Sequence, residues 1–155
     1  MTASETPCNS TQFVRMDVSA DAHTAAAIRR EFSDWLGRYF TLDPTQASDV
    51  VLAVNEAMAN AAEYAYLTAA QPGTMNVQAL YDGSEATLSV SVIDAGAWRT
   101  ADPTTSGHRR GRGIPLMQAL ADHATVDSSQ AGTRVCLEWH HVTAAPTPAR
   151  REARA

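Results

Sequence analysis

The sequence predicts an α+β domain, a two-layer sandwich in which helices cover one face of a mixed, mainly antiparallel sheet. Three observations support this fold class. Segments with alternating apolar residues recur along the chain, long segments with helical apolar spacing lie between them, and Asp82-Gly83 joins two strand-like segments in the manner of a hairpin. The predicted order is strand, helix, helix, two strands, long loop, helix and two strands.

The N-terminal half is predicted to contain one strand and two helices. Residues 12–18 alternate as a strand does, and Asp21 fits the N-cap of an amphipathic helix that runs to about Phe40. Pro44 ends this helix, because a residue before proline disfavours helical geometry, and a second helix follows from about 45 to 67. The apolar side of the first helix carries Ala25, Ile28, Phe32, Trp35, Leu36 and Tyr39.

The C-terminal half is predicted to be mainly sheet, with helical spacing only over residues 114–122. Residues 95–113 are rich in Gly, Pro, Ser, Thr and Arg, and a loop of this length is usually functional or disordered. Strands are expected over 74–82, 86–94, 123–129 and 133–142. The expected organisation is a flexible N-terminus over 1–11, one domain over 12–142 and a disordered tail over 143–155.

Composition and charge limit the classes of function. A chain of 155 residues is long enough for one domain, and its net charge of −5 gives no global case for binding nucleic acid or acidic lipid. No apolar stretch approaches the roughly 20 residues that span a bilayer, and the N-terminus lacks the pattern of a secretory signal. Cys8 and Cys136 have no metal-type spacing, which favours reduced thiols in a cytoplasmic protein.

Residues 55–66, NEAMANAAEYAY, separate into two sides at about 100° per residue. The stripe expected to face the core contains Val51, Val54, Met58, Ala61 and Ala65. The opposite side contains Asp49, Glu56, Asn60 and Glu63. This opposite side is either a solvated helix face or a site for a hard cation such as Mg²⁺, which prefers oxygen ligands. The second alternative gains support because no basic residue between Arg38 and Arg99 balances the acids, and because Asn60 is a poor helix former.

Three further segments carry patterns typical of ligand sites. Asp94 ends an apolar strand and Gly96 follows it, which suits either hydrogen bonding to the edge of a flat ligand or an ordinary turn. The glycines and arginines of 106–117, SGHRRGRGIPLM, lead into a helix start and suit an anion site. A mobile basic loop or an RNA-binding arginine cluster are the alternatives there. The segment AGTRVCLEW alone indicates a turn.

Four segments, taken in order, resemble the N, G1, G2 and G3 boxes of the ATP-binding fold shared by gyrase, Hsp90, histidine kinases and MutL (the GHKL or Bergerat fold). These segments are NEAMANAAEYAY, DAGAWR, GRGIPLMQALAD and GTRV. They are most similar to those of bacterial anti-sigma factor serine/threonine kinases, and the resemblance spans about residues 12 to 140. Two residues depart from the pattern. Trp98 stands where many relatives carry glycine, and Tyr64 stands where close relatives often carry histidine.

The resemblance implies a role for each box. Asp94 would accept a hydrogen bond from the adenine amino group, with Gly96 and Thr133 shaping the base pocket. Asn60 would be the ligand of Mg²⁺, and Glu56 would orient or deprotonate the attacking hydroxyl. Residues 99–113 would form a lid over the ATP, whose expected phosphate contacts are Gly111, Arg112 and Gly113.

The resemblance also implies a function and partners. The expected protein is an ATP- and Mg²⁺-dependent serine/threonine kinase that phosphorylates an anti-anti-sigma (STAS-type) antagonist and sequesters a sigma factor. It is expected to be a homodimer without direct contact to nucleic acid or membrane. His23 lacks the neighbourhood of a phosphoacceptor histidine, so the phosphoryl group is expected to leave for a partner protein or water. The alternatives are an ATP-binding regulatory module without efficient phosphotransfer, and a slow ATPase.

The histidines near the C-terminus are not expected to bind metal. His140 and His141 are adjacent in the last predicted strand, where successive side chains point to opposite faces of a sheet.

Overall fold

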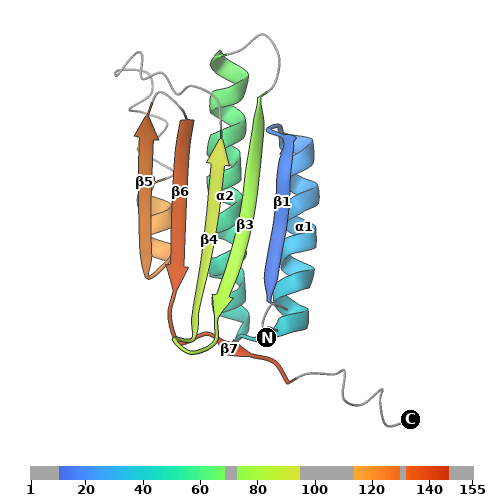
Figure 1. Cartoon of the computed structure of the whole chain (residues 1–155), viewed down its shortest axis with the longest axis vertical. Helices are drawn as coiled ribbons and strands as arrows, with labels where there is room; N and C mark the ends of the chain where they lie inside the picture. Colours follow the sequence, from blue (N-terminus) through green and yellow to red (C-terminus); the bar gives the residue numbers. More distant parts are fainter. Residues whose placement is uncertain (1–10, 69–72, 95–113, 130–131, 147–155) are drawn as a thin grey trace, which may run out of the picture.

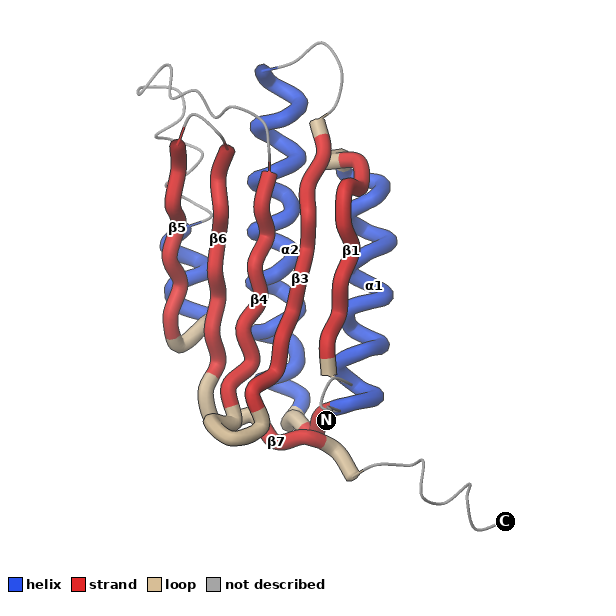
Figure 2. Tube along the Cα trace, viewed as in Figure 1, coloured by secondary structure: helices blue, strands red, loops and turns tan. Residues whose placement is uncertain are grey.

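A computed structural model describes residues 11–68, 73–94, 114–129 and 132–146. Within these residues, a five-stranded sheet forms one layer and the helices lie on one face of it (Figures 1 and 2). The strands of this sheet are β1 (Gln12–Ser19), β3 (Thr74–Asp82), β4 (Thr87–Asp94), β5 (His123–Ser129) and β6 (Gly132–Trp139). The helices are α1 (Ala22–Tyr39), α2 (Pro44–Thr68) and a segment over 114–120. The predicted fold class is confirmed.

The strand order is β1-β3-β4-β6-β5, and each of the four ladders between these strands is antiparallel. The buried residues of β4 are Leu88, Val90, Val92 and Asp94, which alternate along the strand and therefore share one face. This face packs against the helices, and α2 lies across the middle of the sheet (Figure 1). The core is therefore a single layer between the sheet and the helices.

The start of α1 follows the capping prediction. The Asp21 side chain accepts a hydrogen bond from the Thr24 backbone N–H at 2.7 Å, which satisfies one of the unpaired donors of the first turn. This hydrogen bond lowers the pKa of Asp21 below its ordinary value of 3.8. Five of the six residues predicted for the apolar side of α1 are buried, and Tyr39 is half-buried against the core.

The hairpin between β3 and β4 is confirmed, with a longer turn than the sequence predicts. The Asp82 carboxylate accepts hydrogen bonds from the backbone N–H of Ser84 at 3.0 Å and from its hydroxyl at 2.8 Å. Ala86 has a φ of 51°, so the chain turns through four residues and β4 begins at Thr87 instead of 86. The side-chain bonds of Asp82 stabilise this wider turn, which Asp-Gly alone does not predict.

A small second sheet closes the lower end of the molecule and was not predicted. It pairs β2 (Phe40–Thr41) with β7 (Thr143–Ala144). The Ala145 N–H also donates to the Tyr39 carbonyl at 2.8 Å. The expectation that a disordered tail begins at 143 is therefore wrong for these residues. Strands of two residues are too short to show a periodicity, so the sequence does not predict this pairing. The rest of the predicted tail, 147–155, and most of the predicted N-terminal segment, 1–10, lie outside the described residues.

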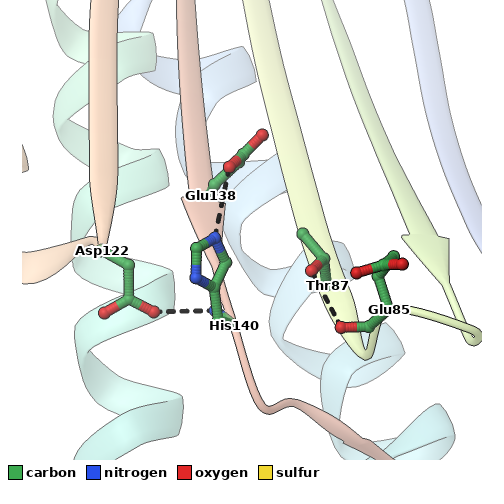
Figure 3. A network of polar contacts seen from close by, with 5 residues as sticks. All are labelled: Glu85, Thr87, Asp122, Glu138 and His140. Atoms are coloured by element: carbon green, nitrogen blue, oxygen red, sulfur yellow. Dashed lines mark hydrogen bonds and ion pairs between the residues drawn. The ribbon is translucent and has the colours of Figure 1, made fainter.

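The last strand ends earlier than predicted, at Trp139, and the histidine pair lies in the bend that follows. His141 has a φ of 59°, so the alternation of a strand does not apply, and the His140 and His141 rings lie 6.5 Å apart between centroids. The expectation that they point to opposite faces is wrong. The backbone N–H of His140 donates to the Asp122 carboxylate at 2.7 Å, and its ring Nε2 lies 3.4 Å from Glu138 Oε1 (Figure 3). This network fixes the end of the sheet remote from Asp94.

In the part of the chain that the structure describes, no helix is both long enough and apolar enough to cross a membrane.

Candidate functional site

Three polar or charged residues are buried among the described residues, and all three were singled out by the sequence. Their exposed fractions are 9% for Asn60, 4% for Asp94 and 3% for Thr133. The other buried residues are apolar. Burying an ionisable carboxyl or an amide costs free energy unless a partner compensates it, so buried polar groups that cluster in an apolar layer commonly mark a functional site.

Asp94 and Thr133 are direct neighbours at the upper end of the sheet. Asp94 is the last residue of β4 and pairs in register with Thr133 near the start of β6. Residues directly opposite each other on antiparallel strands point to the same face, with Cβ atoms about 4.5–5.5 Å apart. Both side chains therefore belong to the face that packs against the helices. The sequence-based pairing of Asp94 with Thr133 in one pocket agrees with this geometry.

The buried side of α2 is wider than predicted and is rotated toward Asn60. The buried residues are Val50, Ala53, Val54, Ala57, Met58, Asn60, Ala61 and Ala62, which span an arc of about 200°. Val51 is only half-buried, so the predicted core stripe was misplaced by one residue at its start. Asn60 lies at the edge of the buried arc instead of on a solvated face, because α2 packs between the sheet and α1 and so buries more than a narrow stripe.

One side of α2 faces α1. Asn55 accepts a hydrogen bond from Arg29 of α1 at 3.4 Å, and hollows of about 830 and 660 Å³ along this seam share these two residues. Seen along the axis of α2, the mean direction of the Glu56 and Asn60 side chains lies about 110° from the direction in which α2 faces α1. They also lie away from the centre of the sheet-facing arc. Glu56 and Asn60 therefore lie on the flank of α2 that is turned away from α1. The helical segment 114–120 lies on the side of α2 opposite α1 (Figure 2).

Asn60 and Asp94 lie at about the same level of the molecule. The distance along α2 from Pro44 to Asn60 is about 24 Å at 1.5 Å per residue, and the distance along β4 from Thr87 to Asp94 is about 23 Å. Both elements start at the lower end, and α2 lies behind β4 (Figure 1). The upper end of the sheet and the Asn60 flank of α2 therefore form two sides of one corner.

The acidic residues predicted to share a face with Asn60 do not all belong to this corner. Glu56 and Asp49 are half-buried on the same flank, whereas Glu63 is exposed. Glu63 lines the hollow between α1 and α2, together with Asp21 and Arg29. The helix pattern groups Glu63 with Asn60 because it treats the helix as isolated, and the position of α1 separates them.

The sequence did not single out two further residues at this corner. Met75 of β3 pairs in register with Asp94 on the side opposite Thr133 and is 1% exposed. Ser128 of β5 pairs with Thr133, and the two hydroxyl oxygens lie 3.4 Å apart. Only the strand register could have identified them, since neither residue carries a motif.

Several predicted site residues lie outside the described residues. These are Gly96, Trp98, Gly111, Arg112 and Gly113, together with the predicted lid over 99–113. Tyr64 lies within α2, but its side chain is not described.

The oxygen donors at the corner fit a magnesium ion better than a metal held by protein alone. Among the described residues, no three His, Cys, Asp or Glu side chains form a group that could hold a metal. Mg²⁺ commonly takes one or two protein oxygens and completes its octahedron with water and substrate phosphates. The amide oxygen of Asn60 offers one such protein ligand, and the carboxylate of Glu56 lies one helical turn away.

Comparison with known proteins identifies a family and a similar solved structure. A family profile described as "Histidine kinase-like ATPase domain" matches residues 18–139. The fold is also similar to a crystal structure of the RsbU and RsbW domains of Rv1364c from Mycobacterium tuberculosis, with a TM-score of 0.64 and 24% sequence identity. The similarity covers 88% of this chain and 33% of that one, so the chain spans about a third of the length of the solved protein.

Proposed function

The chain belongs to the histidine kinase-like ATPase family, and from that premise we propose that it is an ATP- and Mg²⁺-dependent protein serine/threonine kinase that acts as an anti-sigma factor. It would phosphorylate a STAS-type anti-anti-sigma protein and hold a sigma factor inactive. A cytoplasmic homodimer is the proposed form. The burial of Asn60, Asp94 and Thr133 in the otherwise apolar core of the described residues carries this proposal. These residues would provide the groups for a base and for a metal–phosphate complex.

Base recognition is assigned to the upper end of the sheet, where β4 ends and β6 begins. In its ionised form the Asp94 carboxylate only accepts hydrogen bonds, so it would match the amino group of adenine. Its position on the buried face excludes water, which strengthens the hydrogen bond and adds discrimination between bases. Met75 provides an apolar neighbour for the base.

Phosphoryl chemistry is assigned to the flank of α2. Asn60 would hold Mg²⁺ through its amide oxygen, and the ion would neutralise charge on the ATP phosphates. Glu56 precedes Asn60 by four residues, so both side chains project from the same flank. Glu56 would accept the proton of the attacking serine or threonine hydroxyl, and its half-buried position leaves it accessible to a protein substrate.

The acceptor is assigned to a partner protein. His23 is the second residue of α1, directly after the start of the helix. It does not lie on a long pair of helices of the kind that presents a phosphoacceptor histidine. The alternative function is a regulatory module that binds ATP and switches partner exchange without efficient phosphotransfer, and Trp98 at a usual glycine position favours it.

Labelled phosphate transfer tests the proposal. The protein is mixed with [γ-³²P]ATP, Mg²⁺ and a purified STAS-type antagonist, and the labelled antagonist is quantified for wild type and Glu56→Gln. We expect label with wild type and a loss of at least about 100-fold with Glu56→Gln, whose ATP affinity stays unchanged. Glu63→Ala is the matched control on the same helix and should transfer normally, because Glu63 lies on the α1 side.

The outcomes separate the two functions. ATP binding without transfer by wild type would support the regulatory module and reject the kinase. Full transfer by Glu56→Gln would remove this residue from the mechanism.

A further inference from the structure

The upper end of the sheet carries a row of side chains that crosses four of its five strands, from the edge strand β5 to β3. The cross-strand partners are Ser128 of β5, Thr133 of β6, Asp94 of β4 and Met75 of β3, in that spatial order. Directly paired residues share a face, so the row forms one wall of the corner beside α2. Three of its four members, Ser128, Thr133 and Asp94, are polar or charged.

The two hydroxyls in this row face different environments. Thr133 is 3% exposed and cannot exchange hydrogen bonds freely with water, whereas Ser128 is exposed at the edge strand. Their oxygens are 3.4 Å apart, within hydrogen-bond reach, and either can donate. Each hydroxyl has a single proton, so the direction of this hydrogen bond fixes which groups Thr133 can serve on its other side.

The neighbour on that other side determines the direction. Asp94 is the register partner of Thr133, and an ionised carboxylate accepts hydrogen bonds but donates none. If Thr133 donated to Ser128, its lone pairs would face the Asp94 carboxylate. If Ser128 donates to Thr133, the single Thr133 proton is directed away from Ser128, into the space beside Asp94 where the base is proposed to lie. Solvent can satisfy the Ser128 oxygen in this second arrangement, which is therefore the favoured one.

We propose that Ser128 is a positioning residue for base selection, which rests on the proposed binding of ATP at this site. Its hydroxyl donates to Thr133 Oγ1 and keeps the Thr133 proton directed toward the base. The wall then presents an acceptor, Asp94, next to a donor, Thr133. Adenine offers the complementary pair, a donating 6-amino group beside an accepting N1. Guanine offers the reverse, an accepting O6 beside a donating N1–H.

The proposal predicts an effect on selectivity that a structural role would not produce. In Ser128→Ala, the Thr133 hydroxyl can rotate and accept from a guanine N1–H. The ratio of Kd for GTP to Kd for ATP should fall about three- to tenfold, the worth of one neutral hydrogen bond. Ser128→Thr restores a hydroxyl on a strand-favouring residue and should restore the ratio. Ser89→Ala is the matched control, because Ser89 pairs with Glu138 and lies on the face of the sheet away from the helices.

A double-mutant cycle tests whether Ser128 acts through Thr133. Calorimetric titration of the full chain with ATP and GTP is performed for Ser128→Ala, Thr133→Val and the double variant, with melting temperatures measured for each. Thr133→Val removes the hydroxyl at nearly constant shape, so Ser128→Ala should change the GTP-to-ATP ratio less than twofold on that background. An unchanged ratio in Ser128→Ala, or an equal fall on both backgrounds, would overturn the proposal.

The test distinguishes this inference from the proposed kinase function. Wild type that binds ATP but transfers no phosphate would reject the kinase, while the ratios would still decide the role of Ser128. Wild type that binds no ATP would reject both.

Discussion

Asp94→Asn isolates the role of the buried carboxylate, because it removes a charge while it preserves size and shape. Asp94 is 4% exposed and ends β4 between Met75 and Thr133. The substitution should weaken ATP binding, and the melting temperature shows whether the variant keeps its fold.

The expected loss of affinity follows from the hydrogen bond assigned to Asp94. A hydrogen bond to a charged group contributes about 1.5–3 kcal/mol, which corresponds to an increase of about 10- to 150-fold in the Kd for ATP. The upper part of this range is expected, because Asp94 is nearly inaccessible to solvent and water cannot replace the lost contact. ATP and GTP should become closer in affinity, since an amide can also donate to guanine O6.

The assay is calorimetric titration with Mg²⁺-ATP, combined with thermal unfolding of each variant. Asp127→Asn is the matched control. Asp127 is exposed on β5, next to the register position of Ser128, and its own partner is Arg134. The control should bind ATP as wild type does. Wild-type affinity in a folded Asp94→Asn variant would refute the assignment of Asp94 to base recognition.

Three further substitutions test the packing that positions the site. Asp21→Ala should lower the free energy of unfolding by about 1 kcal/mol in chemical denaturation, and an unchanged midpoint would contradict the cap. The pKa of Asp21 is lowered in the fold, so the stabilisation by this carboxylate is complete above its ordinary pKa of 3.8 and is lost as the pH falls through the folded-state pKa. The difference in the free energy of unfolding between Asp21→Ala and wild type should therefore shrink as the pH is lowered through this range. Tyr81→Phe removes the 2.6 Å hydrogen bond to the Val142 carbonyl and should cost about 1–3 kcal/mol by the same assay, with an unchanged midpoint as the contrary result. Phe32→Ala should cost about 3–5 kcal/mol, because Phe32 is fully buried, and a loss below 1 kcal/mol would contradict the core assignment.

The sequence predicted the elements whose signals are local. Alternation indicated β1, β3 and β4, and Asp21 indicated the start of α1 through a capping interaction that spans three residues. Asp94 and Thr133 were grouped through the resemblance of their boxes, and the register confirms that they are neighbours.

Features that depend on packing between distant segments were not predictable in the same way. The pairing of β2 with β7 joins residues about one hundred positions apart and involves two residues on each side. The separation of Glu63 from Asn60 depends on where α1 lies against α2, which a helical projection of α2 does not contain. Ser128 has no motif of its own, and only the β5–β6 register places it beside Thr133.

The magnesium dependence of ATP affinity in wild type and Asn60→Ala tests the central claim most directly. Asn60 is a buried amide on the flank of α2 that also carries Glu56, and its assigned role is to hold the ion. Calorimetric titration with ATP in the presence of Mg²⁺ or of a chelator should show that Mg²⁺ strengthens wild-type binding at least tenfold. Asn60→Ala should lose this strengthening while it keeps the weaker, metal-independent affinity. Equal strengthening by Mg²⁺ in both proteins would contradict the account.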